Sequence, residues 1–239
     1  MHILGHRGAS ALAPENTLPA FEAAITAGAD GVELDVQRCR TGELVVCHDE
    51  ELTRLAGVGW ELRRTPWSDL RTLDVGSRLG FAPARIPLLE EVLESLPRRM
   101  IVNVEIKCER VEDEGLSVAT VKLVKRMGQA GRVVFSSFNP LCLLRVATED
   151  PGLERALLLD PDRNLTLQDA VWAPLTARGS IHPHHGMVTE ERMRRWHQRG
   201  LCVRVWTVND PARARELRAL GVEACITDDP AALRAGLEA

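Results

Sequence analysis

Short apolar runs typical of β-strands alternate with longer helical patterns along nearly all of the 239-residue chain. A helical crossover between neighbouring strands imposes parallel pairing, because a connection of that length cannot form a hairpin. Eight parallel strands close a ring, so the alternation predicts a (β/α)8 TIM barrel. The eight runs lie at residues 2–5, 32–37, 101–107, 132–136, 155–159, 180–183, 201–207 and 223–227.

The length of the chain bears on the number of domains. Barrels of this kind are routinely one domain at such a length, so a single barrel domain over residues 1–239 is expected. An open doubly wound sheet is the alternative arrangement of alternating strands and helices. It lacks support here, because no GxGxxG motif follows a predicted strand.

One segment interrupts the alternation. Residues 43–47 follow the turn signal Arg40-Thr41-Gly42, and we interpret them as the returning arm of a hairpin that extends the second strand. Residues from about 50 to 87 contain several turn signals and no clear period. We therefore expect a small insertion on the barrel rim, followed by a helix at residues 88–96.

Charge and composition argue against several classes of protein. The net charge is −4 and no basic stripe occurs, so a nucleic-acid partner is not expected. No run of about 18 apolar residues is present, so no membrane span is expected. The six cysteines show no CxxC spacing, which favours buried free thiols in a reducing compartment. Strand and motif begin without a charged and apolar leader, which predicts a cytoplasmic protein.

Charged residues inside two predicted strands do not fit an ordinary core. Glu33 and Asp35 are two residues apart and share one face of their strand, as do Glu105 and Lys107 on the next strand. The apolar residues between them occupy the opposite face, which packs under helices, so the charged face points into the barrel. Unpaired buried charge is costly, and three carboxylates against one lysine favour a divalent cation. All-oxygen ligands favour Mg²⁺ or Ca²⁺, and a structural salt-bridge network is the alternative.

Two histidines follow strand-like runs, at the face where barrel enzymes do chemistry. His6 follows the first strand, and His48 ends the hairpin arm. Phosphodiester hydrolysis needs such a pair, because one imidazole takes a proton from the nucleophile and the other gives one to the leaving oxygen. Arg7 and Lys107 would neutralise the phosphate and its developing charge.

Several motifs occur in order from residue 2 to about residue 230. They are His6-Arg7-Gly8, Pro14-Glu15-Asn16-Thr17, Ala20-Phe21, Glu33-Leu34-Asp35-Val36, His48-Asp49, the run IPLLEEVL from residue 86, Asn103-Val104-Glu105-Ile106-Lys107, Ser136-Ser137-Phe138, the run VWTVN from residue 205, and Ile226-Thr227-Asp228. A single short motif of this set would mean little, but the ordered set resembles the glycerophosphodiester phosphodiesterase family.

The resemblance implies a barrel with a small insertion after the hairpin, and an activity that releases sn-glycerol 3-phosphate and an alcohol from a small-molecule glycerophosphodiester. It implies a divalent metal held by the residues that match its acids, and acid–base roles for the residues that match its histidines. It places Glu15 near the site as an orienting partner and Trp206 as an aromatic wall of the pocket. The matching residues are Glu33, Asp35 and Glu105 for the metal, and His6 and His48 for catalysis.

Several points stay open at this stage. A lysophospholipase D acting through the same site and an inactive phosphodiester-binding barrel are the rival functions. The alcohol, the choice between Mg²⁺ and Ca²⁺, the oligomeric state, and direct water attack against a cyclic phosphate intermediate are undecided. Arg204 shares strand parity with Trp206 and is a candidate inward cation, and a histidine cluster follows the sixth strand: His182, His184 and His185.

Overall fold

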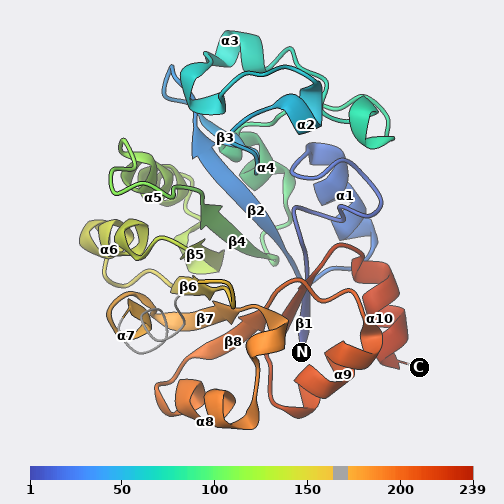
Figure 1. Cartoon of the computed structure of the whole chain (residues 1–239), viewed down its shortest axis with the longest axis vertical. Coiled ribbons are helices and arrows are strands. Elements are labelled where there is room, and N and C mark those ends of the chain that lie inside the picture. The colour runs from blue at the N-terminus through green and yellow to red at the C-terminus, as the bar shows by residue number, and fades with distance from the viewer. Residues whose placement is uncertain (164–171, 239) are drawn as a thin grey trace.

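The computed structural model describes residues 1–163 and 172–238 as a closed barrel of eight parallel strands with helices outside it (Figure 1). The ring runs in the order β1-β9-β8-β7-β6-β5-β4-β2, and β1 pairs with β2 to close it. A further strand, β3, pairs antiparallel with the end of β2. The predicted TIM barrel and its hairpin extension are therefore confirmed.

The strands lie close to the predicted runs. They are β1 His2–Gly5, β2 Gly31–Arg38, β3 Leu44–Val46, β4 Ile101–Ile106, β5 Val133–Ser137, β6 Arg155–Leu159, β7 Gly179–Pro183, β8 Cys202–Val205 and β9 Ala224–Thr227. The largest difference is at β8, which was expected to continue to residue 207. There Trp206 forms only an isolated bridge with His184, because the regular ladder between β7 and β8 has already ended.

The helices occupy the connections between strands. They are α1 Leu18–Thr26, α2 Thr53–Ala56, α3 Trp67–Leu70, α4 Leu89–Ser95, α5 Leu116–Arg126, α6 Pro140–Glu149, α7 Ala173–Thr176, α8 Glu190–Gln198, α9 Pro211–Ala219 and α10 Pro230–Glu238. Capping side chains fix several starting points: Asp210 accepts from the backbone N–H of Ala212, and Thr189 accepts from that of Arg192.

The apolar residues of the strands face the helices. Val32, Leu34 and Val36 of β2 are fully buried in one cluster with Phe21 of α1 and Val92 of α4. A second cluster joins the strands β6 to β9 to the helices α8 to α10, with the fully buried Trp196 among its members. Burial of one such large side chain stabilises the fold by about 1.5–3 kcal/mol. The polar residues at alternate positions are thereby directed into the ring.

The insertion between β3 and α4 packs around a small apolar cluster that it shares with the β2–β3 hairpin. It contains α2, α3 and two short 3₁₀ helices, Leu62–Arg64 and Ser77–Leu79, and extends from one side of the barrel (Figure 1). This cluster buries four leucines of the insertion, with Trp67 packed against it: Leu52, Leu55, Leu62 and Leu70. The segment is therefore more ordered than its lack of period suggested, because short turns of helix meet at one apolar centre.

The six cysteines are free thiols, and all but Cys202 are buried, as predicted. Among the helices of the described residues, none has the length and apolar character that crossing a membrane requires.

Candidate active site

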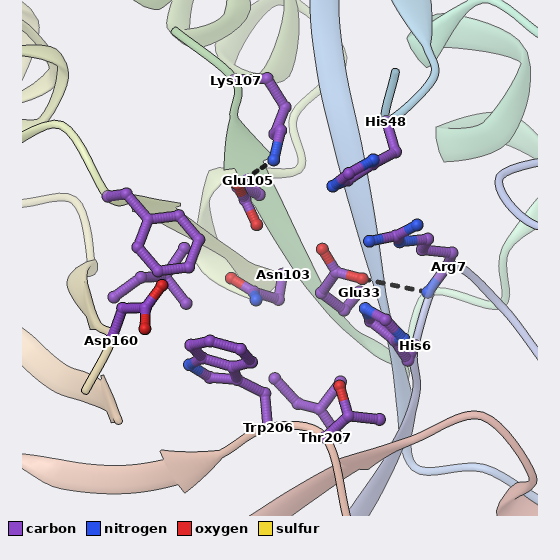
Figure 2. Close-up of a pocket in the computed structure, with 13 residues that line it drawn as sticks. His6, Arg7, Glu33, His48, Asn103, Glu105, Lys107, Asp160, Trp206 and Thr207 are labelled. Carbon is purple, nitrogen blue, oxygen red and sulfur yellow. Dashed lines mark hydrogen bonds and ion pairs between the residues drawn. The ribbon is translucent and has the colours of Figure 1, made fainter. Parts of the chain in front are cut away.

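A cavity of about 250 Å³ opens at the carboxyl ends of the strands, where side chains from most of the ring converge (Figure 2). Charged and polar groups line one part of it, and aromatic and aliphatic groups line another. The lining residues are His6, Arg7, Glu33, His48, Asn103, Glu105, Lys107, Phe138, Leu158, Asp160, Trp206, Thr207 and Ile226.

Three buried carboxylates meet at this cavity, and two of them, Glu33 and Glu105, line it. Glu33 and Asp35 project inward from β2, and Glu105 projects from β4, where it is in register with Asp35. One oxygen of each lies within 4.8 Å of those of the other two. The prediction that these three side chains share the inner face of two neighbouring strands is confirmed, and their oxygens are spaced so that one divalent cation could contact all of them.

Charge crowding is uneven within this acidic triad of Glu33, Asp35 and Glu105. Burial, followed by the nearby Asp35 and Glu105, raises the pKa of Glu33 well above its usual range. Burial also raises the pKa of Glu105, although Lys107 opposes it. Burial acts in the same direction on Asp35, but Arg7 and Lys107 outweigh it and lower the pKa of that carboxyl. Without a cation, the site is therefore short of positive charge mainly around Glu33.

The loop after β1 is bent to bring Arg7 against the triad. Arg7 has a φ of 55°, in the left-handed region that non-glycine residues rarely adopt, and Gly8 follows with a φ of 84°. A Cβ on Gly8 would lie 2.5 Å from the backbone of Ala20, so a larger residue would displace α1. This strained turn directs the backbone N–H of Arg7 to Glu33 at 3.0 Å.

Two cations, Arg7 and Lys107, line the cavity next to the triad. The Arg7 guanidinium contacts Glu15 at 2.8 Å and Asp35 at 3.3 Å. The Lys107 ammonium lies 3.0 Å from Glu105 and 3.8 Å from Asp35. Burial disfavours the charge of each, yet the neighbouring carboxylates raise the pKa of both groups. Both side chains therefore stay charged where an anion would enter.

Each of the two predicted histidines has a carboxylate partner. The Nδ1 atom of His6 lies 2.7 Å from Oδ1 of Asp228, at the end of β9. Asp228 also accepts from Ser10 and from Asn209. Burial opposes ionisation of Asp228, but its bonds to His6 and Asn209 prevail and lower its pKa to about 2. His6 is thus held by a carboxylate that is ionised at neutral pH.

The second histidine is held in the same way by its neighbour in sequence. The Nδ1 atom of His48 lies 2.9 Å from Oδ1 of Asp49. Arg54 of α2 forms two bonds to that carboxylate, at 2.8 and 2.9 Å, and two more to Glu15. Although burial opposes it, these contacts hold the pKa of Asp49 far below its usual range.

Two further expectations concerned Glu15 and Trp206. Glu15 joins Arg7 to Arg54 and does not itself line the cavity, so its place fits an orienting partner. Trp206 does line the cavity, and its indole N–H donates to the carbonyl of His182 at 2.9 Å. It packs edge-to-face on Phe138, with ring centroids 5.5 Å apart.

The three histidines of the cluster left open by the sequence, His182, His184 and His185, do not line the cavity; they lie at the end of β7 and just after it. His182 is fully buried inside the barrel, and His184 packs edge-to-face against Trp206 at 5.2 Å. Arg204 does point inward, but it lies 2.6 Å from Glu154, which precedes β6 at the opposite end of the barrel. Arg204 is therefore not an additional cation of the pocket.

Sequence reasoning assigned no role to several residues of the site. Asp49 and Asp228 orient the histidines, Arg54 links two carboxylates, and Asn103 lines the cavity. Asp49 follows His48 directly, and Asp228 follows a strand that neighbours β1. The sequence positions of both carboxylates could therefore have indicated that each lies near a histidine. Arg54 lies in the insertion, where no period or motif indicated its direction.

Comparison with known proteins gives consistent matches over nearly the full chain. A model of the Glycerophosphoryl diester phosphodiesterase family matches residues 6–232. A glycerophosphodiester phosphodiesterase of Caldanaerobacter subterraneus is 34% identical over 239 residues, covering 97% of this chain and 95% of the relative.

Solved structures agree in fold. A phosphodiesterase of Oleispira antarctica in complex with the product sn-glycerol-3-phosphate superposes with a TM-score of 0.87 at 27% identity, covering 100% of this chain and 97% of that one. A glycerophosphodiester phosphodiesterase of Thermotoga maritima superposes with a TM-score of 0.81 at 31% identity, covering 99% and 98%.

Proposed function

The chain belongs to the glycerophosphoryl diester phosphodiesterase family, a family of hydrolases, and from this premise we propose that it cleaves glycerophosphodiesters to sn-glycerol 3-phosphate and an alcohol. The relative from Oleispira antarctica that binds sn-glycerol-3-phosphate supports this product. The observation that carries the proposal is the arrangement of two histidine–aspartate pairs and two cations around one acidic triad.

The acidic triad fits a divalent cation. Its three carboxylates are buried, and Oδ1 of Asp35 has no hydrogen-bond partner while Oδ2 of the same group accepts from Asn16 at 2.8 Å. Glu33, Asp35 and Glu105 would hold Mg²⁺ or Ca²⁺, since the donors are all oxygen. A bound cation would supply charge stabilisation to the phosphoryl oxygens during displacement.

The two histidines are suited to paired acid–base catalysis. In each neutral imidazole the carboxylate on Nδ1 favours a proton on that atom, which leaves Nε2 to accept a second one. The same carboxylate stabilises the imidazolium after proton transfer. His6 comes from the loop after β1 and His48 from the end of the hairpin, so they reach the cavity from two elements, on either side of Arg7 in Figure 2. We assign the base to His6 and the acid to His48.

Arg7 and Lys107 bind the phosphate in this proposal. Both cations line the cavity, and the charge of each lies against a carboxylate of the triad. An anion entering between them gains charge-assisted hydrogen bonds without further movement of the side chains. Direct attack by water and attack by the glycerol 2-hydroxyl are both compatible with this arrangement.

The rival lysophospholipase D activity requires apolar surface for one acyl chain beside the metal. The apolar lining consists of Phe138, Leu158, Trp206 and Ile226, and none of the described insertion residues contributes to it. A small alcohol such as choline or ethanolamine suits this cavity better. We further propose that residues 1–239 form a single catalytic domain that has no nucleic-acid partner. Its cytoplasmic location stays a prediction.

Leaving-group dependence tests the acid–base assignment. Glycerophosphocholine has a poor alkoxide leaving group. The p-nitrophenyl ester of glycerol phosphate instead releases p-nitrophenolate, which departs without a proton from an acid. His48→Ala should lower kcat on the choline ester by about 10²–10⁴ and on the p-nitrophenyl ester much less, and His6→Ala should lower both alike. The inverse pattern would exchange the two roles. Equal losses in all four combinations would refute acid–base catalysis by this pair.

A further inference from the structure

Asn103 is a buried amide inside the cavity with no hydrogen-bond partner. Its side chain is 1% exposed, yet neither Oδ1 nor Nδ2 bonds to any other group. An unpartnered buried amide costs about 1–3 kcal/mol, so native proteins rarely keep one without a use. The inference drawn here rests on the proposed function and concerns the part of the substrate that this amide meets.

The position of Asn103 distinguishes it from the other polar side chains inside the barrel whose N and O atoms all lack a hydrogen-bond partner. Ser136, Ser180 and His182 are also buried without side-chain partners, but they do not line the cavity. Asn103 does, and it lies in register with Glu33 on β2, two residues before Glu105 on its own strand. Figure 2 shows its amide between these two carboxylates and Trp206. Although it is beside the acidic triad, it donates to none of its members.

The chemistry of an amide restricts what it binds. A phosphate oxygen would meet a donor in Nδ2 but a repelling acceptor in Oδ1, and Arg7 and Lys107 already provide donors elsewhere in the cavity. A hydroxyl group both donates and accepts, so one hydroxyl or a vicinal pair satisfies both ends of the amide. Trp206, which lies beside the amide in Figure 2, offers an apolar face that suits the carbon atoms carrying such hydroxyls.

We infer that Asn103 is a specificity-determining residue that binds a free hydroxyl of the glycerol half of the substrate. The amide then lies beside the triad with the glycerol carbons against Trp206, and the phosphate extends toward Arg7 and Lys107. The alcohol half leaves on the side away from Asn103. A phosphodiester without a free hydroxyl leaves the buried amide unpaired, and the site rejects it for that reason.

Equilibrium binding of phosphomonoesters tests this without involving the chemical step. The probes are sn-glycerol 3-phosphate, 1,3-propanediol phosphate, which lacks the 2-hydroxyl, and 1,2-propanediol 1-phosphate, which lacks the terminal hydroxyl. Titration calorimetry in saturating Mg²⁺ should show the native protein binding sn-glycerol 3-phosphate about tenfold or more tightly than at least one deoxy probe. Asn103→Leu should reduce that preference to less than about twofold, and which probe differs identifies the hydroxyl.

Two controls separate recognition from folding. Inorganic phosphate should bind Asn103→Leu with native affinity, because Arg7 and Lys107 are unchanged. Ser136→Ala removes an equally buried and unpartnered group outside the cavity lining, and it should keep the native preference. A preference that survives in Asn103→Leu, or equal weakening of all probes including phosphate, would overturn the inference. A native protein that binds sn-glycerol 3-phosphate without preference would overturn this inference alone, whereas one that binds neither it nor phosphate would also overturn the proposed function.

Discussion

Replacing Asp228 with Asn is expected to inactivate the proposed base while leaving the barrel folded. Oδ1 of Asp228 lies 2.7 Å from Nδ1 of His6, and Oδ2 accepts a hydrogen bond from the side-chain amide of Asn209 at 2.6 Å. An amide at this position keeps its oxygen on the Asn209 donor and turns its NH₂ toward His6. The Nδ1 atom of His6 must then accept, which places the imidazole proton on Nε2 and removes the acceptor that faces the cavity.

The expected cost of Asp228→Asn in stability follows from the lowered pKa of the Asp228 carboxyl. Its pKa is lowered from 3.8 to about 2, and since one pKa unit is about 1.4 kcal/mol, full burial would make the interaction worth about 2.5 kcal/mol. The side chain is 33% exposed, so screening reduces the cost in stability to about 1 kcal/mol. The cost in rate is larger, about 10²–10⁴ in kcat, because the base is in the wrong tautomer.

The assay compares kcat and melting temperature for the native protein, Asp228→Asn and Ser10→Ala. Ser10 also donates to Oδ1 of Asp228, at 3.0 Å, so its removal takes one hydrogen bond from the carboxylate and leaves His6 paired. It should change kcat by less than about fivefold, in line with about 1 kcal/mol for one hydrogen bond. If Asp228→Asn loses no more activity than Ser10→Ala, orientation of His6 by Asp228 is refuted.

Three other perturbations have defined outcomes. Glu33→Gln should abolish turnover. It should also raise the melting temperature of the metal-free protein by a few degrees, because it removes the most crowded charge of the triad. A lower melting temperature would show that Glu33 stabilises the fold. Glycerophosphocholine should exceed lysophosphatidylcholine at least tenfold in kcat/KM, about 1.4 kcal/mol, and the reverse preference would favour lysophospholipase D. Asp228 has a lowered pKa in the folded state, so its stabilisation is present above about pH 4 and is lost as the pH falls through about 2. The difference in unfolding free energy between native protein and Asp228→Asn should therefore shrink over that interval, and a constant difference would contradict the ion pair.

The barrel and the triad could be predicted because both depend on local periodicity. Alternation of side chains along a strand fixes which face Glu33 and Asp35 share, and parallel order places Glu105 beside them. Arg54 and the internal packing of Trp67 could not be predicted, because they depend on how an aperiodic segment folds on itself. Arg204 shows the limit of parity: the inward face was correctly expected, but not which end of the barrel the side chain reaches.

The pair of His6 and Asp228 also has a consequence for how the enzyme is made. These residues are 222 positions apart and meet only where the first strand joins the last one. A ribosome that has passed β8 has therefore produced all three carboxylates of the triad and both imidazoles, but not the Asp228 carboxylate that pairs with His6. The nascent chain therefore lacks the carboxylate partner of its proposed base until β9 and Asp228 have emerged. Hydrolytic activity thus reports emergence of β9 and closure of the ring in a single measurement.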